Sequence, residues 1–122
     1  MNEPSKIRPL IMKMGDIIFR ENDLADGTMY FIFSGEVAIS KEGFGKIRSL
    51  GQGHFFGEMA LVKSIPRTAT AIVISSTAKI GIIDRPTFAY LARSNPNFLS
   101  NLVSVVAKRA IRTIDRLEAK FV

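Results

Sequence analysis

The sequence predicts a mainly β fold with α-helices: an antiparallel β-roll of the jelly-roll-like barrel type over about residues 10–83, then C-terminal helices over about residues 85–121. Several short runs of aromatic and β-branched residues favour strands. Glycine-containing turns separate these runs at regular spacing, as in an antiparallel barrel. After Ile83 the apolar residues change to the three-and-four spacing of a helix. Because 122 residues suffice for one core but not for two, we expect a single domain over residues 1–122.

The strands are predicted from apolar runs that begin and end at turn-forming residues. The first run follows Gly15 and Asp16, and the segment 23–28 is dense in turn formers. A Ser-Gly-Glu break at 34–36 separates two strands, and Gly43-Phe44-Gly45 forms the next turn. The predicted strands span residues 17–19, 30–33, 37–39, 46–50, 69–74 and 79–83.

Two helices are predicted after the last strand. Asp84 is a suitable N-cap and Pro86 lies in the first turn, which marks a helix start. The segment 94–96, Ser-Asn-Pro, ends this short helix and starts the next. From Leu99 to Phe121 the apolar residues keep the spacing of an amphipathic helix.

Composition excludes several kinds of site. The chain has no cysteine, which excludes disulfides, thiolate metal sites and cysteine nucleophiles and fits a reducing, cytoplasmic location. The sequence contains no run of about 18 apolar residues, so no membrane-spanning helix is predicted. His54 is the one histidine, so we expect neither a metal centre nor a Ser/His/Asp active site, and we predict a protein that is not an enzyme.

The net charge of +6 is concentrated near the C-terminus, where residues 93–122 hold six basic and two acidic side chains. A basic excess attracts polyanions, including nucleic acid and nucleotides. The alternative interpretation is that these basic side chains only form the solvent-exposed face of a helix.

One segment predicts an anion site. Glycine-permitted backbone precedes a short helix-compatible run, Glu58 to Leu61, and the free N–H groups at a helix start attract anions. Arg67 follows six residues after Leu61 and could aim its guanidinium at the same anion. Glu58 fits beside a phosphate if it accepts a hydrogen bond from a ribose hydroxyl. The alternative interpretation is that these glycines only form the turns of a barrel.

The same residues resemble a known family. Phe56-Gly57-Glu58-Met59-Ala60-Leu61 followed by Pro66-Arg67-Thr68-Ala69 is similar to the phosphate-binding cassette of the cyclic-nucleotide-binding domain family. The resemblance implies a short cassette helix over the run from Glu58 to Leu61. That family includes the catabolite activator protein, kinase regulatory subunits and cyclic-nucleotide-gated channels. Residues 15–23 and 30–37 look like its first strands, so the resemblance covers nearly the whole chain.

The resemblance implies a sensor that binds cAMP, with cGMP also allowed, through Phe56, Gly57, Glu58, Met59, Ala60, Arg67, Thr68 and Ala69. Gly57 would let the backbone approach the sugar-phosphate and Glu58 would bind the 2′-hydroxyl. Amides near Met59 and Ala60 would meet the phosphate, and Arg67 would neutralise its charge. The hydroxyl of Thr68 would reach the amino group of guanine.

The C-terminal helix is expected to move when ligand binds and to cover the purine with Arg109 or Arg112. Its apolar seam also permits a homodimer through that helix. One alternative is the sensor half of a transcription regulator of the catabolite-activator type, whose DNA-binding part is absent from this chain. A fused or separate effector domain would then supply the output. Another alternative is a degenerate domain that mediates contacts only, against which the intact Glu58 and Arg67 count.

Overall fold

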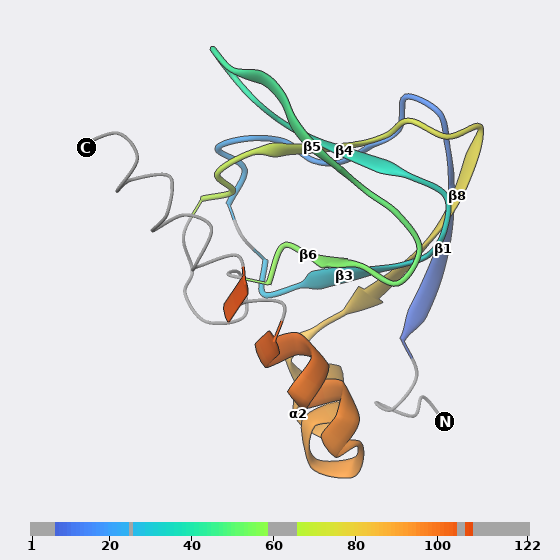
Figure 1. Cartoon of the computed structure of the whole chain (residues 1–122), viewed down its shortest axis with the longest axis vertical. Helices are drawn as coiled ribbons and strands as arrows, with labels where there is room; N and C mark the ends of the chain where they lie inside the picture. Colours follow the sequence, from blue (N-terminus) through green and yellow to red (C-terminus); the bar gives the residue numbers. More distant parts are fainter. Residues whose placement is uncertain (1–6, 25, 59–65, 105–106, 109–122) are drawn as a thin grey trace. The chain divides into compact units, whose positions relative to one another are not determined.

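Residues 7–24, 26–58, 66–104 and 107–108 are described by the computed structural model of the chain, and the structural statements below refer to them. Eight strands in this part of the chain form two four-stranded sheets (Figure 1), and every strand pair is antiparallel. Their bounds are β1 (Arg8–Lys13), β2 (Ile17–Phe19), β3 (Met29–Ser34), β4 (Val37–Lys41), β5 (Gly45–Leu50), β6 (Phe55–Phe56), β7 (Thr70–Val73) and β8 (Thr77–Ile83).

The strand order is β1-β8-β3-β6 in one sheet and β2-β7-β4-β5 in the other. Strands distant in sequence are therefore neighbours, as when β3 pairs with β8 through Ile32 opposite Ile80. This order confirms the predicted β-roll. The cassette helix expected near Glu58–Leu61 lies mostly outside the described residues.

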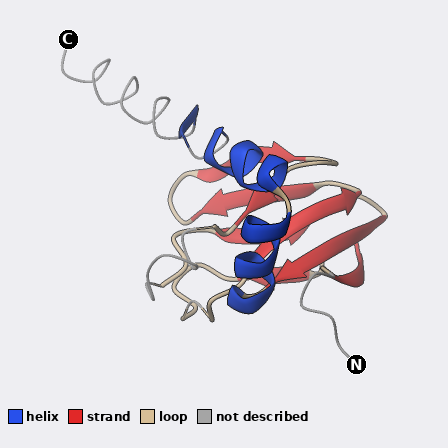
Figure 2. Cartoon of the chain, turned by 90° about the horizontal axis from the view of Figure 1, so that it is seen from below, coloured by secondary structure: helices blue, strands red, loops and turns tan. Residues whose placement is uncertain are grey.

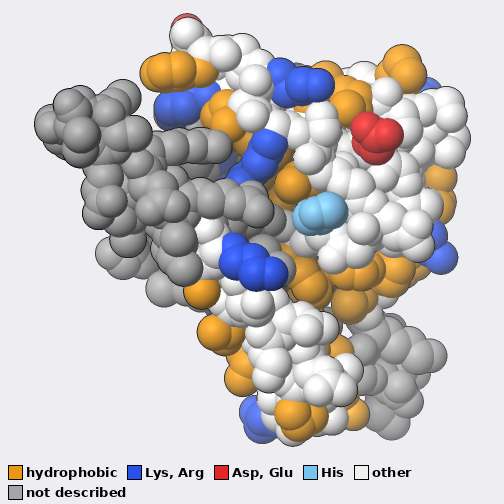
Figure 3. Space-filling view, viewed as in Figure 1, with side chains coloured by type: hydrophobic (Ala, Val, Ile, Leu, Met, Phe, Trp, Pro, Cys, Tyr) orange, Lys and Arg blue, Asp and Glu red, His pale blue; other side chains and the backbone are white. Residues whose placement is uncertain are grey.

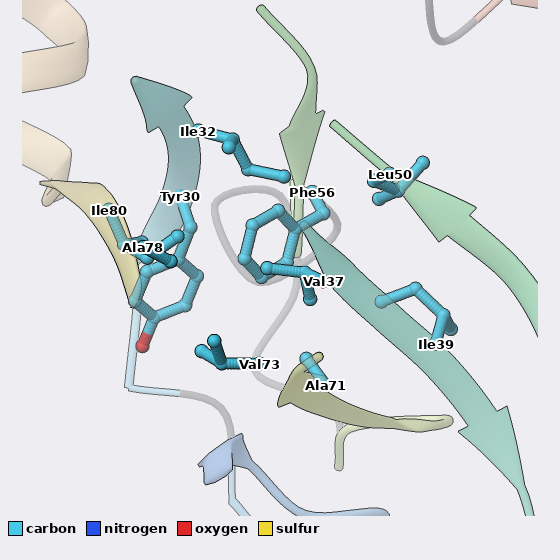
Figure 4. Packing of buried hydrophobic residues seen from close by; sticks show 10 residues of the cluster. All are labelled: Tyr30, Ile32, Val37, Ile39, Leu50, Phe56, Ala71, Val73, Ala78 and Ile80. Carbon is cyan, nitrogen blue, oxygen red and sulfur yellow. The ribbon is translucent and has the colours of Figure 1, made fainter. Parts of the chain in front are cut away.

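The core lies between the two sheets (Figure 4). Alternation along β3 places Tyr30 and Ile32 on this buried face, while Phe31 and Phe33 are only half-buried on the other. Side chains from both sheets meet there: Tyr30, Ile32, Val37, Ile39, Leu50, Phe56, Ala71, Val73, Ala78 and Ile80. Burial of these apolar side chains holds the two sheets against each other.

Two strands are missing from the sequence-based prediction. β1 lies at the edge of its sheet and its side chains are mostly exposed, so it lacks the alternation by which strands are recognised. It also contains Pro9, which has no N–H to donate to a neighbouring strand. An edge strand tolerates a proline because one of its sides has no such neighbour. β6 has only two residues, and its pairing with Tyr30 and Phe31 makes it a strand.

The chain divides into two compact units, Met1–Phe88 and Ala89–Val122, and the strands all lie in the first. Helix α2 (Arg85–Ser94) begins as predicted, because the Thr87 N–H donates to Asp84 Oδ1 at 2.9 Å. A second helix, residues 96–104, follows α2 (Figure 2). It is capped in the same way, because Phe98 N donates to Asn95 Oδ1 at 3.2 Å. No helix in the described ranges is both long and apolar enough to cross a membrane.

Candidate anion-binding site

Arg67 is a buried cation whose guanidinium lies among backbone and side-chain oxygens. The residue is 7% exposed. Its Nη1 donates to the Gly57 carbonyl at 3.1 Å, and its Nη2 donates to the Thr28 carbonyl at 2.9 Å. The same Nη2 lies 3.3 Å from Oδ1 of Asp26 and forms an ion pair with it. A charge this deeply buried is stable only when such partners replace water.

Two aromatic rings lie beside the guanidinium. Arg67 Cζ is 4.3 Å from the ring centroid of Phe19 and 5.7 Å from that of Tyr30. Tyr30 in turn stacks on Phe56, with 5.3 Å between ring centroids. The face of an aromatic ring attracts a cation, so these core residues hold the charged group from one side.

The backbone of Arg67 is held by the loop that follows β2. Asn22 N donates to the Arg67 carbonyl at 2.7 Å, and Arg67 N donates to the Asp23 carbonyl at 2.8 Å. A β-bridge between Leu24 and Pro66 continues this pairing. The position of Arg67 therefore depends on a loop more than forty residues earlier in the sequence.

Gly57 lies where the guanidinium approaches the main chain most closely. Its φ is +74°, in the left-handed region that favours glycine. A Cβ at this position would lie 2.8 Å from Nη1 of Arg67. The glycine predicted to allow close approach of a ligand thus also makes room for the arginine.

Asp26 faces the solvent side of the ion pair. Its side chain is 66% exposed, against 6% for that of Arg67. Burial raises the pKa of the Asp26 carboxyl, but hydrogen bonds from the Thr28 hydroxyl and backbone N–H, together with the charge of Arg67, outweigh it and leave the pKa below its ordinary value. The carboxyl is therefore ionised at neutral pH, and the arginine is already paired with an exposed anion.

The structure brings Gly57 and Arg67 into contact, and Glu58, which follows Gly57, is half-buried. Phe56 is buried in the core. Thr68 is exposed, whereas Ala69 is partly buried against the core cluster. Four other predicted site residues, Met59, Ala60, Arg109 and Arg112, lie outside the described residues. The ligand contacts of all these residues stay predictions.

The sequence analysis missed the residues that hold the arginine. Asp26 and Thr28 belong to a segment interpreted only as a turn, and Phe19 and Tyr30 were interpreted only as strand residues. Nothing near Asp26 in the sequence marks it as a partner of Arg67. A buried cation needs polar partners, but nothing in the sequence marks Arg67 as buried.

Basic side chains do not form one continuous patch on the face shown in Figure 3. Lys and Arg, in blue, lie in separate places with hydrophobic and other side chains between them. The described part of the chain holds no group of three or more metal-ligating side chains. The guanidinium of Arg67 offers N–H donors of the kind that bind an anion.

Comparison with known families gives a match over most of the chain. A family model described as a cyclic nucleotide-binding domain matches residues 10–95. This range includes both sheets, except for the first residues of β1, and the surroundings of Arg67.

Relatives of known description are similar over the same region. The cAMP-dependent protein kinase regulatory subunit of Schizosaccharomyces pombe is 30% identical over 95 residues, covering 78% of this chain and 23% of that protein. A cyclic nucleotide-gated potassium channel of Rhizobium etli is 30% identical over 105 residues, covering 84% of this chain and 28% of that protein. The chain spans between 14% and 28% of the length of these curated relatives and others that it matches.

A solved structure has a similar fold. The catabolite activator protein of Thermus thermophilus matches with a TM-score of 0.80 and 25% sequence identity, covering 92% of this chain and 54% of that one.

Proposed function

Because the chain belongs to the family of cyclic nucleotide-binding domains, we propose that it is a sensor module that binds cAMP, and also cGMP, beside Arg67. Of the relatives to which it is similar, the kinase regulatory subunit is described as cAMP-dependent and the potassium channel as cyclic nucleotide-gated. As a sensor module, the chain would carry out no catalytic step.

The observation that carries this proposal is the environment of the Arg67 guanidinium. It is buried, held by the carbonyls of Gly57 and Thr28, and paired with a carboxylate on its solvent side. A cyclic phosphodiester carries one negative charge, as does the carboxylate of Asp26. The phosphate oxygens of the nucleotide can accept hydrogen bonds from two N–H groups of a guanidinium at once. The ammonium group of a lysine does not offer such a pair of donors. The ligand would thus join or displace an anion that the protein already supplies.

The neighbours of Arg67 supply the remaining recognition in this proposal. Glu58 accepts a hydrogen bond from the ribose 2′-hydroxyl, which distinguishes a ribonucleotide from a deoxyribonucleotide. Thr68 is exposed, so its hydroxyl is accessible to a guanine amino group, which is why we include cGMP. The backbone at Met59, Ala60 and Ala69 adds contacts to the phosphate.

Signal output requires that the C-terminal helix have two positions. In our proposal the purine draws this helix inward, with Arg109 or Arg112 covering the base. A ligand shifts such an equilibrium only by its difference in affinity for the two states, and coupling of this kind is typically about 1–3 kcal/mol.

Calorimetric titration with cAMP and cGMP tests the proposal, with 5′-AMP as a control that has the same base and sugar but no cyclic phosphodiester. We expect cAMP to bind and to raise the melting temperature, and 5′-AMP to bind far more weakly. Absence of both heat and thermal shift with millimolar cAMP and cGMP would refute the proposed function.

Variants locate the binding site. Glu58→Ala and Arg67→Ala should each weaken cAMP binding by well over tenfold, about 1.4 kcal/mol or more. Lys13→Ala, which removes an exposed cation from β1, should leave the affinity nearly unchanged. Since Arg67 is buried, its variant requires a check of folding by circular dichroism, and Glu58→Ala is the independent test if that variant is unfolded. Unchanged affinity in both folded variants would contradict the site.

A second candidate is the sensor part of a transcription regulator, favoured by the similarity to catabolite activator protein at a TM-score of 0.80 over 92% of the chain. In that case the protein containing this chain should bind duplex DNA. A gel-shift with random DNA over a salt series tests this, because contacts to phosphates give affinity that falls steeply with salt. Binding independent of salt, or no binding, would favour another output.

A further inference from the structure

A lysine outside the predicted site is bonded to the residue that follows Arg67. Lys41, the last residue of β4, donates from Nζ to the carbonyl oxygen of Thr68 at 2.9 Å. This contact links the end of a strand in one sheet to the end of the cassette. Neither the sequence motif nor the contacts of Arg67 include Lys41.

Glu21 holds this lysine in place. Its Oε2 lies 3.6 Å from Lys41 Nζ, and its Oε1 accepts a hydrogen bond from Glu42 N at 2.9 Å. Its own N–H donates to Thr70 Oγ1 at 2.9 Å. Glu21 is only 19% exposed, against 40% for Lys41, so the carboxylate is the better-fixed member of the pair. The ammonium thus contacts both the Glu21 carboxylate and the Thr68 carbonyl.

The contact constrains the peptide group between Thr68 and Ala69. A trans peptide is planar, with its C=O and N–H pointing in opposite directions. Because the Thr68 C=O points toward Lys41 Nζ, the Ala69 N–H of the same peptide points away from that ammonium. The side chain of Ala69 packs against the core cluster, which restricts rotation of the same peptide from its other end. A charged donor gives a stronger hydrogen bond to the carbonyl than a neutral one would.

We propose that Lys41 is a positioning residue for cyclic-nucleotide binding, which holds the Thr68–Ala69 peptide so that the Ala69 N–H is presented to the phosphate of the ligand. This inference rests on the proposed function. Lys41 acts through the peptide and not by touching the nucleotide, and Glu21 acts through Lys41.

Three variants of the full chain test the inference, with cAMP as the probe in calorimetry. Lys41→Met removes the ammonium and keeps most of the stem, whereas Lys41→Arg retains a charged donor. Lys46→Met is the matched control, because Lys46 is an exposed lysine of the neighbouring strand β5, opposite Ser40, and its loss changes the net charge equally. The amide resonance of Ala69 is followed by NMR in the ligand-free variants, since it responds to the hydrogen bond that Lys41 makes with the carbonyl of the same peptide.

We expect Lys41→Met to weaken cAMP binding roughly tenfold and to shift the Ala69 amide resonance. Lys46→Met should change affinity less than about twofold, and Lys41→Arg should restore most of the loss. An equal loss in Lys41→Met and Lys46→Met would mean that only long-range charge matters and would overturn the inference. So would an unchanged Ala69 resonance, or unchanged affinity in Lys41→Met while the wild type binds. If the wild-type chain itself binds neither cAMP nor cGMP, the proposed function is refuted rather than this role.

Discussion

Replacing Gly57 with alanine separates the backbone strain of this position from its contact with Arg67. Gly53 is the matched control: its φ is +87° against +74° for Gly57, but a Cβ at Gly53 would meet no atom within 4 Å. Both substitutions place an alanine in the left-handed region, which costs roughly 1–2 kcal/mol. Only Gly57→Ala adds a methyl group 2.8 Å from Nη1 of Arg67.

The additional cost follows from the displaced guanidinium. Ordinary contact begins near 3.5 Å, so the group must retreat by roughly 0.7 Å, and its 3.1 Å hydrogen bond to the Gly57 carbonyl is weakened or lost. A hydrogen bond to a charged group contributes about 1.5–3 kcal/mol. We therefore expect Gly57→Ala to lower the free energy of unfolding by about 3 kcal/mol or more, and Gly53→Ala by only the strain of about 1–2 kcal/mol.

Urea unfolding without ligand and cAMP titration together measure these effects. A domain of this size typically has about 5–15 kcal/mol of stability, so both variants should remain folded. Gly57→Ala should weaken cAMP binding by at least about tenfold, and Gly53→Ala by less than about threefold. If the two variants are equally stable and bind cAMP equally, the reasoning about Arg67 and Gly57 is wrong.

Four further predictions concern stability. Asp84→Ala removes the cap that accepts from the Thr87 N–H and should cost about 1 kcal/mol, measured by thermal unfolding. Phe56→Ala should cost about 3–5 kcal/mol in urea unfolding because this ring is 2% exposed. Phe44→Ala, at a residue 77% exposed, should cost less than about 0.5 kcal/mol. The pKa values of Asp26 and Asp84 are lowered in the folded chain, so their stabilisation is present at neutral pH and is lost as the pH falls below about 4. Melting temperatures should fall over that range, less steeply in Asp26→Asn than in the wild type, and equal slopes would contradict the role of Asp26.

Much of the fold was predictable because its signals are local. Alternating aromatic and β-branched residues predicted β3 and β4, and Asp84 followed by Pro86 predicted the start of α2. The edge strand β1 and the two-residue strand β6 were not predicted, since neither has a pattern of its own. Their strand geometry depends on pairing with β8 and β3.

The candidate site divides in the same way. The motif placed Gly57, Glu58 and Arg67 in one site, and the structure brings Gly57 and Arg67 into contact. The ion pair of Arg67 with Asp26 joins residues 41 positions apart, and the bond from Lys41 to Thr68 joins residues 27 apart.

By itself, the sequence determined the class of fold, the family resemblance and the residue types that can bind a cyclic phosphate. Periodicity and a short motif are properties of neighbouring residues, so a single chain displays them. Only the tertiary structure decided that the arginine is buried on aromatic rings, that Asp26 is its anion, and that Lys41 holds the peptide beside it. The register of the sheets and the path of the loop after β2 place these groups together, and no local pattern encodes which distant residues then meet.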